Sequence, residues 1–204
     1  IDNEKYIDGG FKNQIPIDLA IRMGAEKIIA VDICFFKMGK QDLKNKKVEI
    51  IVIKPHKNIG SGIIFDSKIS KRNIKYGYND TMKAFNKLYG KRYTFKNINN
   101  NLLKERIFNT ECKLIETMEY LAKIFNFNDT IIYSKEVFNK KLFNELDKIE
   151  LDKKAKSKNI INTKEIIKYI YLQLKNKNKK EILKVAKLFI REYKAAYYLY
   201  ILSI

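Results

Sequence analysis

The sequence predicts an α/β domain followed by a helical extension, and three observations lead to that prediction. Apolar runs rich in β-branched residues occur at 28–33 and 48–53, as expected of short strands. The segments before and after these runs have apolar residues at helical spacing. After residue 90 apolar residues repeat at three- and four-residue intervals, and no strand-like run of comparable length follows. We therefore expect an α/β part over residues 1–90 and a helical part over 91–204.

The first expected elements form a strand, a helix and a second strand. An apolar pair beginning at Tyr6 leads as a short strand into Asp8, and two glycines then permit a tight turn. A helix over 16–23 follows, and Gly24 supplies its stop. The apolar run at 28–31, with Ile33 beyond Asp32, is typical of a strand that is covered on both faces. Such an arrangement predicts a right-handed parallel βαβ unit.

The remaining elements of the first part come after a lysine-rich connection. A strand is expected at 48–53, and Pro55 ends it because proline cannot continue the hydrogen-bonded ladder. Residues 69–74 fall in a short helical stretch. A separate helix is expected to begin at Gly77 and to be closed by Gly90.

The second part is predicted to consist of helices alone. Apolar spacing indicates one helix through 114–125, and Ser134 is suited to cap the next. Asn162, with a glutamate three residues later, resembles a capping box at the start of another helix. The last helix is expected to run through 182–200. The polar, lysine-rich stretch 152–160 is the predicted internal linker.

The chain is strongly basic. Lys and Arg total 42 and Asp and Glu total 23, which gives a net charge of +19 over 204 residues. Residues 1–90 carry 17 basic and 10 acidic groups, or +7, and residues 91–204 carry 25 and 13, or +12. A phospholipid surface or a nucleic acid is physically suited to such a charge. The alternative is a compositional bias of the whole chain, since lysine, asparagine and isoleucine are abundant throughout.

The two cysteines indicate a reducing compartment, and hydropathy bears on membrane insertion. Cys34 and Cys112 form no C-x-x-C pair, so neither a disulfide framework nor a zinc site is predicted. No apolar run reaches the roughly 18–20 residues that a membrane-spanning helix needs, and no signal peptide pattern opens the chain. We expect a cytoplasmic or peripheral membrane protein. Because the chain begins with Ile1 and a strand is expected almost at once, we also expect an N-terminal part to precede it.

An ordered series of motifs runs from Asp8 to Asp32. It comprises Asp-Gly-Gly at 8–10, Asn-x-x-Pro at 13–16 opening a helix, Gly-Ala at 24–25, and an apolar strand that ends in Val-Asp. This series closely resembles the C-terminal motif block of bacterial patatin-like phospholipases. A weaker resemblance extends through Lys54-Pro55, Phe65-Asp66 and Gly77-Tyr78. No resemblance is found beyond residue 90.

The resemblance implies the C-terminal part of a three-layer α/β/α domain. In that family the aspartate of the Asp-Gly-Gly motif partners a serine in a G-x-S-x-G motif, and a glycine-rich loop provides the oxyanion hole. Only Asp8 matches a residue of that catalytic set. None of the six serines lies in G-x-S-x-G, and Ser61 between two glycines lacks the spacing. The nucleophile is therefore expected in a missing N-terminal segment of the same protein.

The chemistry implied by the resemblance is hydrolysis of lipid esters by a serine–aspartate dyad. A carboxylate within hydrogen-bond reach can take the proton of a serine hydroxyl, and no histidine is then required. Asp8 would act as base and then as acid on phospholipid or acylglycerol substrates at a membrane surface. No cofactor and no metal are expected. The 204 residues alone are expected to be inactive.

Each candidate residue also has a structural alternative. An aspartate before two glycines is commonly only a turn residue, and Asn13 is expected to hold the turn through a backbone bond. His56, the sole histidine, is expected to be an ordinary loop residue, and Asp32 a structural one. The tyrosines around Tyr197 suit either a lipid-facing surface or helix packing.

The sequence leaves alternatives to ester hydrolysis. A non-catalytic membrane- or partner-binding regulatory module is the main alternative. A nucleotide-binding domain is disfavoured because neither glycine-rich phosphate motif occurs. Nucleic acid is disfavoured as a partner because no recognised binding module accompanies the charge.

Overall fold

The computed structural model describes residues 3–8, 13–33, 48–60, 64, 66–98, 105–108, 110–151 and 162–204. The chain divides into two compact units, Ile1–Lys87 (unit 1) and Leu88–Ile204 (unit 2). The division lies close to the boundary expected at residue 90. The predicted linker 152–160 lies outside the described residues. No described helix has both the length and the apolar character that a membrane crossing requires.

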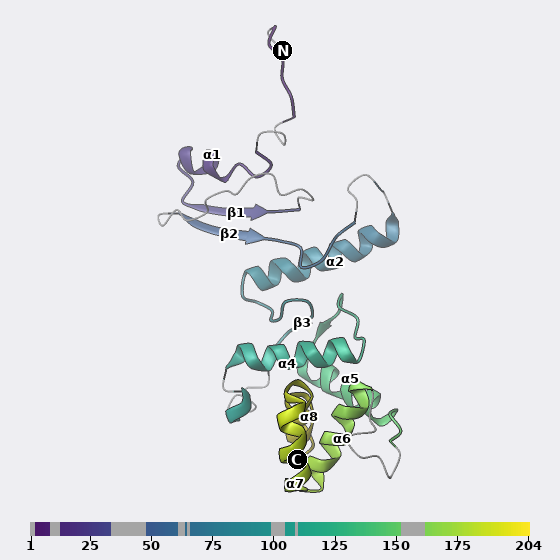
Figure 1. The fold of residues 1–204 in the computed structure, drawn as a ribbon. Helices are drawn as coiled ribbons and strands as arrows, with labels where there is room; N and C mark the ends of the chain where they lie inside the picture. Colours follow the sequence, from purple (N-terminus) through teal and green to yellow (C-terminus); the bar gives the residue numbers. More distant parts are fainter. Residues whose placement is uncertain are drawn as a thin grey trace. The chain divides into compact units, whose positions relative to one another are not determined.

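Unit 1 combines helices with a small parallel sheet, so this part of the chain is α/β (Figure 1). Its described elements are α1 (Ile17–Arg22), β1 (Lys27–Val31), β2 (Glu49–Ile53) and α2 (Ser67–Ala84). Strands β1 and β2 pair in parallel over their whole length, from Lys27 opposite Glu49 to Val31 opposite Ile53. Helix α1 contacts β1, and α2 contacts β2.

Local sequence signals explain how α1 begins and ends. Pro16 occupies the residue before the helix, where a missing N–H removes no helical hydrogen bond. The backbone N–H of Ile15 donates to the Asn13 side chain at 3.2 Å, so the predicted backbone bond of Asn13 is present. Gly24 follows the helix with a φ of +87°, a conformation that favours glycine. The expected helix at 16–23 is therefore confirmed to within a residue at each end.

Helix α2 is continuous, and the prediction of two separate helices was wrong. Asp66 caps its N-terminus by accepting from the N–H of Ile69 at 2.7 Å. Gly77 lies inside the helix, where a glycine costs about 1 kcal/mol relative to alanine. That cost is small enough to be offset by the cap and by the contacts of the buried residues Tyr76 and Asp80.

The helix also ends earlier than predicted, because Gly90 does not close it. Helix α2 stops at Ala84, and Gly90 lies in a turn of unit 2 beside the bridge between Tyr89 and Phe95. Gly90 has a φ of +101°, and a Cβ there would collide with the carbonyl oxygen of Tyr93. The glycine is needed for this turn rather than for a helix stop.

The sheet of unit 1 differs from the expectation in two respects. Ile29 and Val31 on one face of β1 are 53% and 58% exposed, so β1 is not covered on both faces within the described residues. Tyr6 and Ile7 are 66% and 77% exposed and form no strand before Asp8. A buried strand needs a paired neighbour and a layer on each face. The described residues of unit 1 provide α1 and α2 but leave this face of β1 open.

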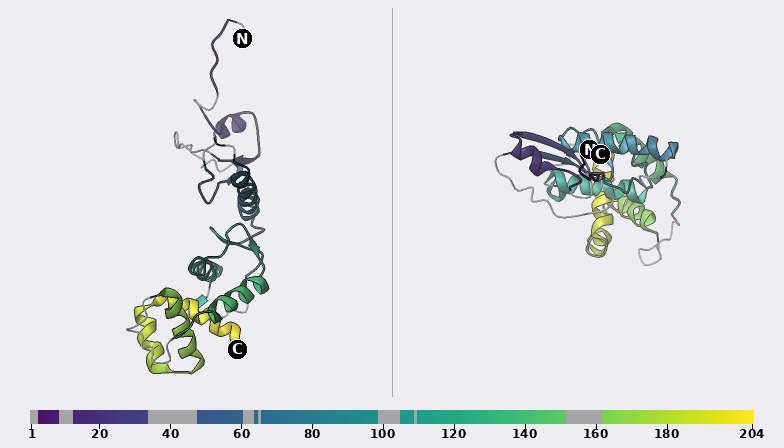
Figure 2. Two further views of the ribbon diagram at one scale, coloured as in Figure 1. Left: turned by 90° about the vertical axis from the view of Figure 1, so that its right-hand side faces the viewer. Right: turned by 90° about the horizontal axis from the view of Figure 1, so that it is seen from above.

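Unit 2 is mainly helical (Figure 2). Its described elements are β3 (Thr94–Phe95), η2 (Arg106–Phe108), α4 (Glu111–Ile124), β4 (Ile132–Tyr133), α5 (Lys135–Asp147), α6 (Thr163–Lys175), α7 (Lys179–Leu188) and α8 (Ile190–Ser203). Strands β3 and β4 form a two-residue parallel pair, so the prediction of an all-helical extension was wrong in this detail. Sequence periodicity does not reveal a pairing of only two residues per strand.

Two predicted helix starts in unit 2 are confirmed by their caps. The Ser134 side chain accepts from the N–H of Val137 at 3.3 Å at the start of α5. The Asn162 side chain accepts from the N–H of Lys164 at 2.9 Å at the start of α6. Caps of this kind depend on a few neighbouring residues, which is why the sequence reveals them.

The single last helix expected at 182–200 is instead two helices. Phe189 has φ −130° and ψ 65°, outside the helical region, and it separates α7 from α8. Val185 of α7 and Ala195 of α8 are both buried in the same core. The break thus lets helices α7 and α8 each turn an apolar side toward that core.

Aromatic side chains fill much of the core of unit 2. Phe138 is fully buried and meets Phe95, Phe127 and Tyr198 edge-on, with ring centroids 5.2, 5.4 and 6.4 Å apart. Edge-to-face contacts of this kind add to the stabilisation from area burial. Helix α8 contributes to the same core and contacts α4, α6 and α7.

The tyrosines of α8 pack against protein rather than forming a lipid-facing surface. Tyr198 is fully buried, and its hydroxyl donates to the side chain of Asn139 at 2.9 Å. Tyr197 is half-buried and donates to Glu105 at 2.9 Å. Of the two alternatives that the sequence left open, the structure favours helix packing.

A first prediction concerns the aromatic core. Phe138→Ala should lower the free energy of unfolding of unit 2 by about 3–5 kcal/mol, because it removes a fully buried ring and leaves a cavity. Val137→Ala, next to it on α5 but exposed, should change it by less than about 0.5 kcal/mol. Urea unfolding followed by circular dichroism measures both. Equal effects would contradict the packing described here.

A second prediction concerns alkaline pH. Burial raises the pKa of Tyr197 from 10.0 to about 12, and the hydrogen bond to Glu105 adds to the rise. The stability that this neutral hydroxyl contributes should be full below pH 10 and lost as the pH rises towards 12. Tyr197→Phe should therefore make the loss of stability between these pH values shallower. Urea midpoints measured across that range test it, and an unchanged slope would contradict it.

Candidate functional site

Asp8, the residue expected to be catalytic, is exposed and lies in segment 3–8, outside any helix or strand. The glycines at 9–10 lie outside the described residues. The residues that follow Asp8 in the motif are thus not described, and we draw the role of Asp8 from the sequence alone. The motif continues in the turn before α1, where the Asn13 side chain donates to Asp18 at 2.8 Å.

Polar residues follow both strands of the parallel sheet at their carboxyl ends. The N–H of Asp32, directly after β1, donates to the carbonyl oxygen of Ile53 at 2.9 Å and so extends the ladder. The Asp32 carboxylate forms an ion pair with Lys54, directly after β2, at 3.2 Å. This edge of a parallel sheet is where ligands commonly bind. The structural role expected of Asp32 is consistent with both contacts.

His56, also beyond the end of β2, belongs to a buried pair. Its ring Nδ1 lies 2.8 and 3.0 Å from the two carboxylate oxygens of Asp80 on α2. The backbone N–H of His56 also donates to Asp80 at 3.1 Å. The side chains of His56 and Asp80 are only 9% and 6% exposed. The pair therefore ties the sheet edge to α2. His56 lies in the loop after β2 as predicted, but its side chain is buried and paired.

The environment of the pair fixes the orientation of the imidazole ring. Tyr76 meets the ring edge-on with centroids 4.8 Å apart. Lys57 and Arg72 lie over the Tyr76 ring at 5.7 and 5.6 Å. The His56 Nε2 atom is buried and has no hydrogen-bond partner among the described residues. The contacts seen for this pair are structural ones, because they join the end of β2 to α2.

The sequence carries only a weak signal for this pair, namely two adjacent polar residues within a helix. Asn79 and Asp80 are adjacent polar residues on α2, and both are buried. Buried polar groups are almost always hydrogen-bonded, so a polar pair on the inner side of a helix implies a partner elsewhere. The partner itself lies 24 residues away and cannot be identified by periodicity.

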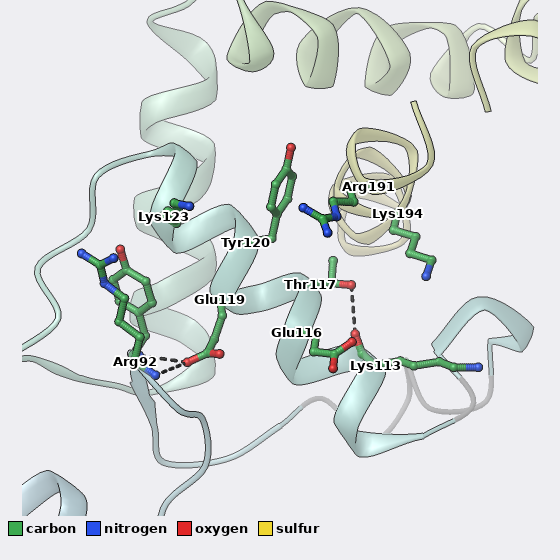
Figure 3. Close-up of a pocket in the computed structure, with 10 residues that line it drawn as sticks. Arg92, Lys113, Glu116, Thr117, Glu119, Tyr120, Lys123, Arg191 and Lys194 are labelled. Atoms are coloured by element: carbon green, nitrogen blue, oxygen red, sulfur yellow. Dashed lines mark hydrogen bonds between the residues drawn. The ribbon is translucent and has the colours of Figure 1, made fainter. Parts of the chain in front are cut away.

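A basic pocket in unit 2 has a volume of about 470 Å³ (Figure 3). We call it the basic pocket. Its walls come from helices α4 and α8 and from the segment before β3. Five cationic side chains line it: Arg92, Lys113, Lys123, Arg191 and Lys194. Figure 3 shows Arg191 pointing from α8 toward Tyr120 and Thr117 of α4.

Three carboxylates near the basic pocket, Glu119, Asp129 and Glu192, have structural partners. Glu119 accepts from the backbone N–H groups of residues 91, 92 and 93 at 2.7, 2.7 and 3.0 Å, which fixes that wall. Arg92 is also 3.5 Å from Asp129. The Tyr120 hydroxyl donates to Glu192 at 2.6 Å, and burial followed by this bond raises the pKa of Tyr120. These contacts hold the walls of the pocket in place.

Sequence reasoning identified the helical half as the more basic one but not the pocket. The five cations are spread over about a hundred residues of sequence, and no motif links them. Among the described residues, no group of three or more histidine, cysteine, aspartate or glutamate side chains is placed to hold a metal ion.

Comparisons with protein-family models, with curated proteins and with solved structures found no match. The patatin-like resemblance therefore rests on the motif series from Asp8 to Asp32 itself.

A third prediction tests the buried pair. Asp80→Asn should lower the free energy of unfolding of unit 1 by about 1–3 kcal/mol, because it removes the charge that His56 contacts and weakens buried hydrogen bonds. Glu49→Gln makes the same chemical change in a surface pair with Lys27 and should cost less than about 0.5 kcal/mol. Hydrogen exchange of peptides from α2 reports on unit 1 separately. Equal protection in both variants would contradict the role assigned to the pair.

Proposed function

We propose that this chain is the C-terminal portion of a patatin-like lipid acyl hydrolase, in which Asp8 is the acid–base member of a serine–aspartate dyad. The observation that carries the proposal is the ordered motif series from Asp8 to Asp32. The intact protein would hydrolyse ester bonds of phospholipids or acylglycerols at a membrane surface. The serine and the oxyanion loop would come from a segment upstream of Ile1.

The local structures within the motif series support the proposal. The Asn-x-x-Pro motif lies in a hydrogen-bonded turn that leads directly into α1. The glycine of Gly-Ala ends the helix in a left-handed conformation. The apolar run before Asp32 forms β1, which belongs to a parallel sheet. A turn, a helix and a parallel strand in this order are what a three-layer α/β/α domain requires of these residues.

The uncovered face of β1 gives further support. Ile29 and Val31 are aliphatic, and both are more than half exposed. Parallel strands are almost always covered on both faces. We propose that the upstream segment adds strands and a helical layer to this sheet. Tyr6 and Ile7 would then gain the neighbour that a strand before Asp8 needs.

The proposed role of Asp8 follows from carboxylate chemistry. In the complete site the carboxylate would accept the proton of the serine hydroxyl as the serine attacks the acyl carbonyl. Backbone N–H groups of the upstream loop would stabilise the oxyanion. Asp8 would then protonate the leaving alcohol, and in the second half-reaction it would activate water. The fatty acid is thereby released and the serine is regenerated.

A fourth prediction tests this role. The 204 residues should be inactive alone, and joining them to the upstream G-x-S-x-G segment should give hydrolysis of a phospholipid ester. In that longer chain Asp8→Asn should reduce the rate by about 10²–10⁴-fold, the usual contribution of a general acid–base group. Glu26→Gln, an exposed carboxylate of the same motif region, should stay within about twofold of the parent. Retained activity in Asp8→Asn would refute the assignment.

The basic pocket favours a second function, a non-catalytic membrane- or partner-binding module. Its five cations gather in unit 2, which is separate from the unit that carries Asp8. Flotation with liposomes at two salt concentrations distinguishes the two functions. Binding by the longer chain without any ester hydrolysis would favour the module, whereas hydrolysis that depends on Asp8 would favour the enzyme.

A further inference from the structure

We propose that the basic pocket is a binding site for a phosphate group, carried either by a lipid headgroup or by a small soluble phosphate ester. The pocket lies wholly in unit 2, between α4, α8 and the segment before β3. Binding there is independent of the role proposed for Asp8. It assigns a function to the helical half, where the sequence resembles no known family.

The balance of charge makes the pocket attractive to an anion. Five cationic side chains line it against two carboxylates, Glu116 and Glu119. Glu119 already accepts three backbone N–H groups, so much of its charge is compensated within the protein. Within the described part of the chain, Lys123, Arg191 and Lys194 form no ion pair. The positive charges of these three side chains are therefore not neutralised by a described carboxylate and can attract an anionic ligand.

The type and placement of the donors suit phosphate. Arg191 and Lys194 are three residues apart on α8, so both project from one side of that helix. Lys123 reaches the pocket from α4. A guanidinium group binds two phosphate oxygens at once, and an ammonium group adds a mobile point charge. Cations from two helices thus line one pocket, in which Arg191 points toward α4 while Lys194 extends away from it (Figure 3).

The size and lining of the pocket favour a small ligand over a polymer. Its volume of about 470 Å³ falls within the range of about 300–1,000 Å³ that is usual for small-molecule sites. The rings of Tyr93 and Tyr120 supply apolar surface beside the cations. A pocket of this size suits one phosphorylated group, whereas a nucleic acid backbone needs an extended basic surface.

The walls are held in place before any ligand arrives. Glu119 fixes the segment that carries Arg92, and Tyr120 is bonded to Glu192 on α8 at 2.6 Å. Helices α4 and α8 are in contact and share the buried core of unit 2. A rigid pocket loses little conformational entropy on binding, which favours affinity for a small anion.

Titration of the full chain with inorganic phosphate tests the proposal, with chloride at the same ionic strength as the reference. The double variant Arg191→Gln/Lys194→Gln should weaken phosphate binding by about tenfold or more, since two charge-assisted hydrogen-bond donors are lost. The matched control Lys180→Gln/Lys187→Gln removes the same charge from exposed positions of α7. It should stay within about twofold of the parent. Isothermal titration calorimetry gives the dissociation constants.

A second variant guards against effects on folding. Lys123→Gln removes a pocket cation from α4 without changing α8, and it should also weaken phosphate binding while the circular dichroism spectrum is unchanged.

Two results would overturn the proposal. One is the absence of phosphate binding by the parent chain at millimolar concentrations. The other is equal loss in the pocket and control double variants, which would indicate diffuse charge rather than a site.

Vesicles identify the source of the phosphate group. Binding to phosphatidylcholine vesicles is compared with binding to the same vesicles containing phosphatidic acid. Binding that requires phosphatidic acid and is lost in the pocket variants but not in the control assigns a lipid headgroup. Phosphate binding in solution without vesicle binding assigns a soluble phosphate ester. Either outcome supports the site.

Discussion

The packing of α8 is the contact on which most of unit 2 depends. Its small residues Ala195 and Ala196 and its aromatic residue Tyr198 are fully buried, and the helix touches α4, α6 and α7. Alanines allow close approach of neighbouring helices, and the tyrosine ring reaches the aromatic cluster around Phe138. The same packing determines where Arg191 emerges. The basic pocket is therefore a direct consequence of how α8 is held against α4.

Unit 1 depends on a different kind of contact, one between polar groups. The carboxylate of Asp80 binds both the backbone and the ring of His56, and so joins α2 to the end of β2. A pair of this kind is costly to bury unless its hydrogen bonds are made. Among the described residues of unit 1, only a few hydrophobic side chains are buried: Ile17, Ala30, Ile53 and Tyr76. The His56–Asp80 pair adds polar contacts to this small apolar core.

The two units thus offer two distinct kinds of chemistry. Unit 1 carries the Asp-Gly-Gly motif and a parallel sheet but, within the described residues, does not form a site around Asp8. Unit 2 carries a formed pocket with cations from two helices. A hydrolase acting on lipids would benefit from both, since a phosphate-binding pocket can hold a charged headgroup or sense an anionic ligand. Each function can be tested without the other.

The sequence by itself determined the features that depend on a few neighbouring residues. Strands β1 and β2, the helix after Pro16 and the caps at Ser134 and Asn162 follow from periodicity, backbone preference and local hydrogen bonds. The motif series at Asp8 likewise can be recognised without a structure.

Only the tertiary structure decided which distant residues meet. It joined His56 to Asp80, separated α7 from α8 at Phe189, continued α2 through Gly77 and gathered cations from Arg92 to Lys194 into one pocket. Among the described residues, Ile29 and Val31 on one face of β1 are more than half exposed, where the apolar run predicted burial on both faces. The reason is physical: long-range contacts are selected by the packing of whole elements, and that packing can override the preference of a single residue.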